Sequence, residues 1–236
     1  MNTNSKPKYE ILPSSEYAMV INGKIVQRIR ALRDIPRHKV LAGDLGGWVQ
    51  NTVNLSQTGD CWIKDEAMAW DGSQVRGNAL LYDHAIIDNM ARLKKNCRVG
   101  GYSVVRGSAT VTDNSVISER SIIKGSITIA GHSHITGSSV VSGDVNTLAC
   151  LRDVYLTDDA YITEAKDYCR IENVDRNGTV MAGFMTVTGE LRFQFYRNKE
   201  QRDEVKSLLE GDFCNLHVRR HQRTVFEFIK EHLSRK

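Results

Sequence analysis

The sequence predicts a mainly β fold: a parallel β-solenoid with a hairpin cap before it and an α+β region after it. Three periodic series between Ile63 and Val145 carry this prediction. Every sixth residue is apolar, a turn residue stands two places after each, and a small residue stands four places after each. The apolar places are Ile63, Ala69, Val75, Leu81, Ile87, Leu93, Val99, Val105, Val111, Ile117, Ile123, Ile129, Ile135 and Val141.

The two accompanying series are almost as regular. Eleven of the fourteen small places hold Ala or Ser, and twelve of the fourteen turn places hold Gly, Asp or Asn. Lys95 and Glu119 are the exceptions in the turn series. A helix cannot use this period, because six is not a multiple of 3.6 and the apolar residues would spiral around it. Short strands can, since inward and outward side chains alternate and a Gly or Asp then turns each corner.

This hexad motif resembles that of the hexapeptide-repeat proteins. The resemblance implies a left-handed triangular parallel β-helix with three hexads per turn, typically assembled as a trimer. Left-handed crossovers are exceptions to the usual rule, so handedness follows from the resemblance alone. With three hexads per turn, residues 18 apart in sequence would stack at about 4.8 Å spacing.

This stacking sorts the outward residues into three columns. The second column is mixed (Trp62, Leu80, Arg98, Val116, His134), and the third is polar (Gln74, Arg92, Thr110, Thr128). The first is apolar throughout: Met68, Ile86, Val104, Ile122 and Val140, with Trp70 beside it. Nothing in building a solenoid requires an apolar outward column, so we expect an interface here. A second subunit, a C-terminal helix lying along the column or another protein could cover roughly 300 Å² of apolar surface.

Residues 1–48 are expected to form an N-terminal arm and hairpin cap. Asn22-Gly23 stands between two apolar runs, which is typical of a type I′ hairpin turn. The hairpin would cover the open end of the solenoid, where unpaired strand edges invite aggregation.

The passage GGWVQNTVNLSQTGDCWI, from Gly46 to Ile63, is a second recognisable motif. Together with LRDI at 32–35 and GDL at 43–45, it resembles the opening of the YdcK-type β-helix proteins of enterobacteria and of related phage-borne proteins. That family carries an acyltransferase label. In this passage we expect Trp48 and Trp62 to cover the first turn.

The solenoid is expected to occupy residues 49–175, and an α+β region residues 176–236. The repeat loses its phase from Asn146 to Asp153 and resumes briefly around Leu156, Ala160 and Ile162. Residues 179–196 alternate around Thr188-Gly189-Glu190, which indicates a hairpin. Apolar spacing predicts two helices, over 198–210 and 223–234.

Composition excludes several classes of protein. A net charge of +4, from 32 basic and 28 acidic residues, does not argue for nucleic acid as a partner. Five cysteines without CxxC spacing argue against a disulfide framework and a zinc site, and Cys61 and Cys97 fall in the small inward series. No apolar run approaches 18 residues, so we expect a cytoplasmic protein without a membrane segment.

We therefore expect a non-catalytic interaction module without a cofactor or metal. It would form a homo-oligomer, with a trimer favoured, and bind a macromolecular partner or sequester a small ligand. The resemblance to phage-borne proteins makes a host component a conceivable target. The alternative is an acyltransferase that uses acetyl-CoA or another acyl-CoA, with its site between adjacent subunits.

Hexapeptide-repeat acyltransferases typically use a histidine general base on a loop extruded from a turn. The fourteen hexads here contain no insertion, so the candidate bases are His84, His132 and His134. Each is equally a surface turn or strand residue. No carboxylate or Cys stands close to His132 and His134 in the sequence, so the pair does not indicate a metal site.

A basic run before the last predicted helix could contact a phosphate or an acidic partner through Arg219, Arg220 and Arg223. It is otherwise a solvated helix start. The sequence carries no phosphate-binding glycine loop and no nucleophile elbow.

Overall fold

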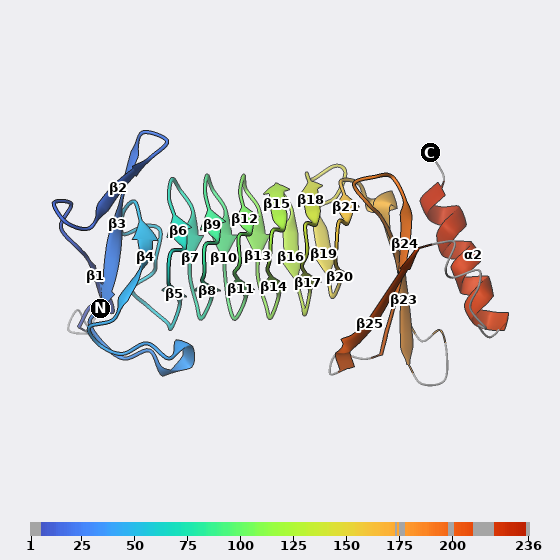
Figure 1. The fold of residues 1–236 in the computed structure, drawn as a ribbon, viewed down its shortest axis with the longest axis horizontal. Coiled ribbons are helices and arrows are strands. Elements are labelled where there is room, and N and C mark those ends of the chain that lie inside the picture. Colours follow the sequence, from blue (N-terminus) through green and yellow to red (C-terminus); the bar gives the residue numbers. More distant parts are fainter. Residues whose placement is uncertain (1–5, 173, 175–177, 198–200, 210–219, 235–236) are drawn as a thin grey trace.

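The computed structural model describes residues 6–172, 174, 178–197, 201–209 and 220–234. A long solenoid of very short strands occupies the middle of the molecule (Figure 1). The N-terminal strands lie at one end of it, and an antiparallel sheet with one helix lies at the other.

Three parallel sheets form the solenoid, and each sheet takes one strand from every turn. The first face contains β4 (Leu45–Val49), β6 (Met68–Ala69), β9 (Ile86–Ile87), β12 (Val104–Val105), β15 (Ile122–Gly125), β18 (Val140–Gly143) and β21 (Tyr161–Ile162). The second face contains β5 (Trp62–Ile63), β8 (Leu80–Leu81), β11 (Arg98–Val99), β14 (Val116–Ile117), β17 (His134–Ile135) and β20 (Tyr155–Leu156). The third face contains β7 (Gln74–Val75), β10 (Arg92–Leu93), β13 (Thr110–Val111), β16 (Thr128–Ala130) and β19 (Cys150–Arg152).

The strand register confirms three hexads per turn. Val104 pairs with Ile86 on one side and with Ile122 on the other, in steps of 18 residues. All fourteen inward apolar residues from Ile63 to Val141 are fully buried. The predicted turn places from Asp65 to Gly137 adopt positive φ, including the two exceptions, Lys95 at 56° and Glu119 at 61°. The corner geometry is thus imposed by the coil even where the residue type does not favour it.

The repeat ends earlier than the sequence predicts. The repeat predicts that Val145 points inward, but it is 74% exposed and lies in a loop after β18. The loop lengthens one turn, so that Thr128 pairs with Cys150, 22 residues later. The predicted resumption around Leu156, Ala160 and Ile162 is confirmed, because all three side chains are fully buried.

The predicted N-terminal hairpin is confirmed. Strand β2 (Ala18–Ile21) pairs antiparallel with β3 (Lys24–Ala31), and Asn22 and Gly23 have φ values of 50° and 74° in the turn. Strand β3 also pairs with β1 (Tyr9–Ile11) and with β4, which continues the first face through β6. The hairpin therefore adds antiparallel strands to the sheet of the first face, beyond the first full turn of the solenoid.

The two tryptophans of the opening passage occupy different places. Trp62 is fully buried, and the ring of Tyr9 meets it edge-on at 6.4 Å between centroids. Trp48 pairs in register with Met68 on the first face, and its Nε1 donates a 2.9 Å hydrogen bond to Glu66. Trp62 thus belongs to the core of the capped end, and Trp48 stands in line with the apolar column.

The C-terminal region is an antiparallel sheet with a helix, as the predicted α+β class requires. Its strands are β22 (Tyr168–Ile171), β23 (Thr179–Met185), β24 (Leu191–Arg197) and β25 (Gln201–Leu209). The hairpin predicted around Gly189 joins β23 to β24. The helix predicted over 198–210 is wrong for residues 201–209, because pairing with β24 overrides their helical apolar spacing.

The predicted final helix is present as α2 (Arg220–Ser234). Its residues Phe226, Ile229 and Leu233 pack against Met181 and Phe193 of the sheet. The other side of the sheet closes the end of the solenoid, where Phe184 joins the solenoid core. Helix α2 therefore does not lie along the apolar column, and that way of covering the column is excluded.

Candidate functional site

A short basic loop crosses the second face near the capped end. Ile35 and Val40 anchor it: both are buried, and their backbones exchange hydrogen bonds of 2.9 and 3.3 Å. Between them, Pro36 opens a single 3-10 turn that ends at His38, and Lys39 follows with φ of 55°. Consecutive basic residues, 37–39, are thereby held over the strands of the second face.

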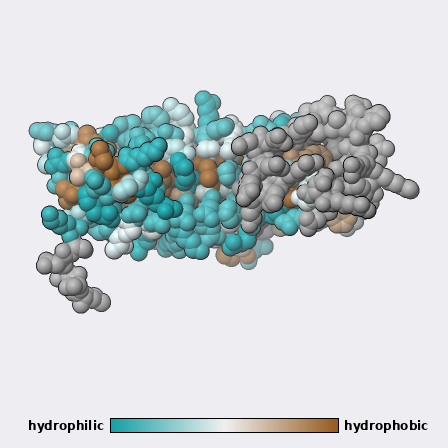
Figure 2. Space-filling model, turned by 90° about the horizontal axis from the view of Figure 1, so that it is seen from below, coloured by the Kyte–Doolittle hydropathy of each residue, from teal (hydrophilic) through white to brown (hydrophobic). Residues whose placement is uncertain are grey.

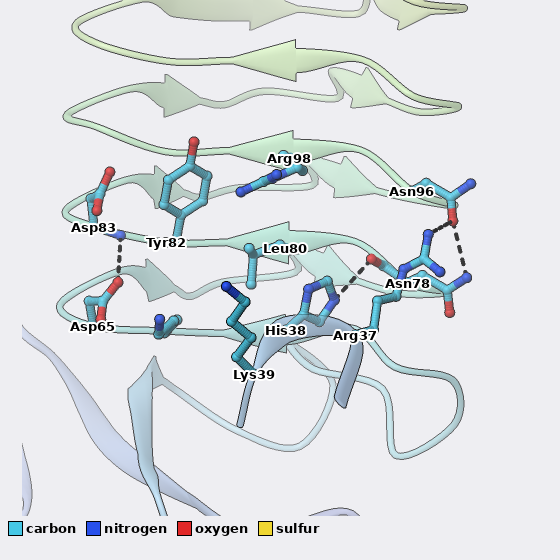
Figure 3. A pocket seen from close by; sticks show the side chains of 11 residues that line it. Arg37, His38, Lys39, Asp65, Asn78, Leu80, Tyr82, Asp83, Asn96 and Arg98 are labelled. Carbon is cyan, nitrogen blue, oxygen red and sulfur yellow. Dashed lines mark hydrogen bonds between the residues drawn. The ribbon is translucent and has the colours of Figure 1, made fainter. Parts of the chain in front are cut away.

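The loop and the second face enclose a pocket of about 530 Å³, here called the His38 pocket (Figure 3). Loop, strand and corner residues all contribute to its wall. Its lining consists of Arg37, His38, Lys39, Lys64, Asp65, Asn78, Leu80, Tyr82, Asp83, Asn96 and Arg98.

An asparagine ladder positions two of the loop residues. Asn78 Nδ2 donates a 3.1 Å hydrogen bond to Asn96 Oδ1, one turn further on. Arg37 Nη2 donates to the same Asn96 oxygen at 3.0 Å, and His38 Nε2 lies 3.2 Å from the backbone oxygen of Asn78 (Figure 3). The loop and the solenoid thus orient these side chains together.

An apolar floor lies beneath the basic groups. Leu80 is only 6% exposed, and Tyr82 stands two residues after it. A Cβ built on Gly100 would lie 2.1 Å from the Tyr82 ring, so only glycine lets this ring lie across the next turn. The Arg98 guanidinium stands 5.4 Å from the centre of the same ring, within cation–π range.

The pocket carries excess positive charge. Arg37, Lys39, Lys64 and Arg98 line it, and none of them forms an ion pair with a carboxylate of the described residues. The two lining carboxylates accept hydrogen bonds from backbone amides instead. Asp65 accepts from the N–H of Asp83 at 3.3 Å, and Asp83 accepts from the N–H of Gly101 at 2.9 Å. The cations therefore remain available to an acidic ligand.

The His38 imidazole is uncharged in its resting state. Burial lowers the pKa of its imidazole below the usual 6.5, so the ring is mainly neutral at pH 7. Because a neutral imidazole must carry hydrogen on Nε2 to donate to the Asn78 oxygen, we assign the lone pair to Nδ1.

The histidines identified from the sequence lie elsewhere. His84 is exposed at a corner and stacks on Tyr102, with 4.8 Å between ring centroids. Asn96 Nδ2 donates a 3.2 Å hydrogen bond to Asn114, which extends the asparagine ladder by one turn, and His132 lies 3.2 Å from Asn114. His132 Nδ1 also lies 3.5 Å from the carboxylate of Asp153, a neighbour that the sequence does not place beside it. His134 stacks on Tyr155, with 5.7 Å between ring centroids. The structure does not bring these three into the His38 pocket.

The apolar column is continuous on the first face. Met68, Ile86, Val104, Ile122 and Val140 pair in register and each remains partly exposed. Trp70, beside the column, is 7% exposed. The tip of the N-terminal hairpin reaches this edge, where Lys24 forms an ion pair with Asp71.

A further set of apolar side chains is exposed at the capped end. Val20 is 71% exposed, Leu41 63%, Ile25 54% and Val53 52%. Figure 2 shows apolar residues gathered at that end of the molecule, on a side whose described surface is otherwise mostly polar.

Of the basic run predicted to bind an anion or a partner, Arg219 lies outside the described residues. Arg220 begins α2, and Arg223 lies in its first turn. An anion site there stays a prediction.

Sequence reasoning missed the His38 pocket, although part of it was visible. The signal was the run of basic residues 37–39 between two apolar residues that could pair. The contribution of Leu80, Tyr82 and Arg98 was not visible, because it depends on where the loop crosses the solenoid.

Two negative findings apply to the part of the chain that the structure describes. None of its helices combines the length and the apolar character needed to cross a bilayer. No three His, Cys, Asp or Glu side chains in it are grouped so as to hold a metal ion.

Comparison with known proteins gives a distant similarity. A 64-residue stretch, 27% of this chain, is 33% identical to the Escherichia coli (strain K12) protein named "Uncharacterized acetyltransferase YdcK". The match spans only 19% of that protein's length. No family model matches the chain. This similarity and the parallel solenoid together fit the hexapeptide-repeat β-helix proteins that the sequence resembles.

Proposed function

We propose that the protein is a non-catalytic interaction module: a rigid solenoid that assembles with copies of itself through the apolar column and presents its remaining surfaces to a ligand or partner. The observation that carries this proposal is the column itself. Five apolar residues stand in register on one face, and the helix that could have covered them packs on the C-terminal sheet instead.

The energetics favour burial of the column. Five side chains of this size could together present up to roughly 300 Å² of apolar surface, near the size at which patches on monomers are functional. Removing that area from water would contribute about 5–8 kcal/mol per subunit before the cost of association. The resemblance to hexapeptide-repeat proteins favours a trimer, in which each prism packs its first face against a neighbour.

The capped end supplies a second surface for a macromolecular partner. Val20, Ile25, Leu41 and Val53 are all more than half exposed there. The phage-borne proteins that the opening passage resembles make a host protein in the cytoplasm the partner we propose for this end.

Sedimentation velocity of the pure protein tests the assembly. We expect a species of about three chain masses, with dissociation only at low concentration. A chain that sediments as a monomer at all concentrations up to the millimolar range would refute assembly through the column.

A second candidate function is acyl transfer from an acyl-CoA. The acetyltransferase name of the similar E. coli protein and the neutral imidazole of His38 favour it. In this reaction His38 Nδ1 would take the proton of a hydroxyl or amine as that group attacks the thioester carbonyl. The CoA thiolate would leave and receive the proton.

Turnover of acetyl-CoA in the presence of candidate acceptors tests this second function. His38→Ala would abolish turnover if His38 is the base, and the variants His84→Ala, His132→Ala and His134→Ala would retain it. If one of these three variants loses turnover and His38→Ala retains it, the base is that histidine and not His38. A wild-type chain without turnover, and without a thermal shift by any CoA ester, would leave the interaction module as the function.

A further inference from the structure

We infer that the His38 pocket binds an organic phosphate of nucleotide size, with the phosphoryl group among the basic side chains and the remainder against the Leu80 and Tyr82 floor. This inference depends neither on self-association nor on acyl transfer, because the pocket lies within one chain and needs no reaction.

The charges of the pocket select an anion. Four cationic side chains face one cavity, and the two carboxylates that share its wall are engaged by backbone N–H groups. Arg and Lys side chains form their strongest hydrogen bonds with phosphate and carboxylate oxygens. A phosphate monoester carries close to two negative charges at neutral pH, so it matches this excess better than a single carboxylate does.

Two of the donors are already oriented. Arg37 is held by Asn96 at 3.0 Å, and Arg98 stands over the ring of Tyr82. They come from opposite sides of the pocket, one from the loop and one from strand β11 (Figure 3). Because both side chains are oriented before binding, an anionic ligand that contacts either of them would need little additional ordering of the protein.

The size of the pocket favours a ligand larger than inorganic phosphate. A volume of about 530 Å³ falls in the range of sites for small organic ligands. The nearly buried Leu80 and the ring of Tyr82 offer an apolar surface that phosphate alone would leave unused. A sugar or a base attached to the phosphate would use it.

Isothermal titration calorimetry of the full chain in low-salt buffer tests the inference. The probes are AMP, ribose 5-phosphate, inorganic phosphate, adenosine and coenzyme A. We expect saturable binding of AMP, with adenosine at least about tenfold weaker because it lacks the charge, and inorganic phosphate also weaker because it lacks the ring. Comparing ribose 5-phosphate with AMP shows whether the sugar or the base makes the apolar contact. Coenzyme A shows whether the pocket accepts a larger phosphate ester.

Matched variants locate the binding. Arg37→Ala and Arg98→Ala should each weaken AMP binding about tenfold or more. Arg106→Ala is the control, because Arg106 lies near the first face, where it pairs with Asp88 at 3.1 Å. Circular dichroism and melting curves establish that each variant folds.

The inference is overturned if none of the phosphate probes binds saturably, or if both pocket variants bind AMP as the wild type does. Equal affinity for AMP and inorganic phosphate would refute the role of the apolar floor. Each of these results is independent of the sedimentation experiment and of acetyl-CoA turnover.

Discussion

Lys8 Nζ donates a 2.8 Å hydrogen bond to the backbone oxygen of Cys61, and both residues are fully buried. On the second face, the backbone oxygen at the equivalent position of each later turn accepts a hydrogen bond from a backbone N–H of the preceding turn. The Ala79 oxygen, for example, accepts from the N–H of Trp62 at 3.0 Å. Cys61 belongs to the first turn of that face, so no earlier strand can donate a hydrogen bond to its carbonyl oxygen. A lysine side chain therefore closes this open edge, with further contacts to the Gly59 oxygen at 3.4 Å and the Cys61 sulfur at 3.1 Å.

Lys8→Met should destabilise the protein by about 1–3 kcal/mol, because it leaves the buried Cys61 carbonyl oxygen without this donor. The measurement is the free energy of unfolding in urea. Lys6→Met, a change at an exposed residue of the same segment, is the control and should be nearly neutral. Equal stability of the two variants would show that the edge does not depend on Lys8.

The same lysine predicts a pH dependence. Burial lowers the pKa of Lys8 below its usual 10.5. Between the lowered pKa and 10.5 the unfolded chain binds more protons than the folded one, so the free energy of unfolding rises with pH across that interval. The slope of stability against pH below 10.5 should be smaller in Lys8→Met than in the wild type. Identical slopes would contradict a lowered pKa at this site.

Ile122→Asp should convert the assembly to monomers, because a carboxylate in the middle of the apolar column would be buried without a partner. Thr110→Asp on the polar third face is the control and should keep the wild-type sedimentation coefficient. If Ile122→Asp changes neither assembly nor melting temperature, the column is simply exposed to water and the proposed interface is wrong.

Gly100→Ala should displace the Tyr82 ring, since the added Cβ would lie 2.1 Å from it. The expected results are a loss of Tyr82 near-UV dichroism and weaker AMP binding in calorimetry, with the solenoid intact in far-UV spectra. Ser118→Ala, a change one turn further along the same face, serves as the control. Unchanged AMP affinity in Gly100→Ala would show that the position of the Tyr82 ring does not matter for AMP binding.

The solenoid was predictable because each hexad repeats the same local choices. Each hexad repeats an inward aliphatic residue, a small residue and a turn residue. Because the pattern recurs so often, a single unfavourable residue such as Lys95 or Glu119 at positive φ does not alter the fold. The C-terminal region has no such redundancy. Residues 201–209 carry helical spacing but form β25, because the edge of β24 offers them a partner that local sequence does not reveal.

The candidate site was predictable only in part. The apolar column follows from the 18-residue period, and its residues stack as expected. The His38 pocket depends on a loop that contacts the chain 40 residues later, where His38 meets the Asn78 backbone. No periodic signal encodes this contact, so the sequence indicates His84, His132 and His134 as candidate bases and does not indicate His38.

The central claim is that three hexads make one turn, because this stacking creates both the column and the pocket. Paired cysteines test it most directly. Arg92 and Thr110 lie in register on neighbouring turns of the third face, at a spacing of about 4.8 Å that suits a disulfide. Oxidised Arg92→Cys/Thr110→Cys should show, by mass spectrometry of the digested monomer, an internal cross-link between these positions, and Arg92→Cys/Val116→Cys, on different faces, should not. A cross-link in the second pair and none in the first would contradict the account.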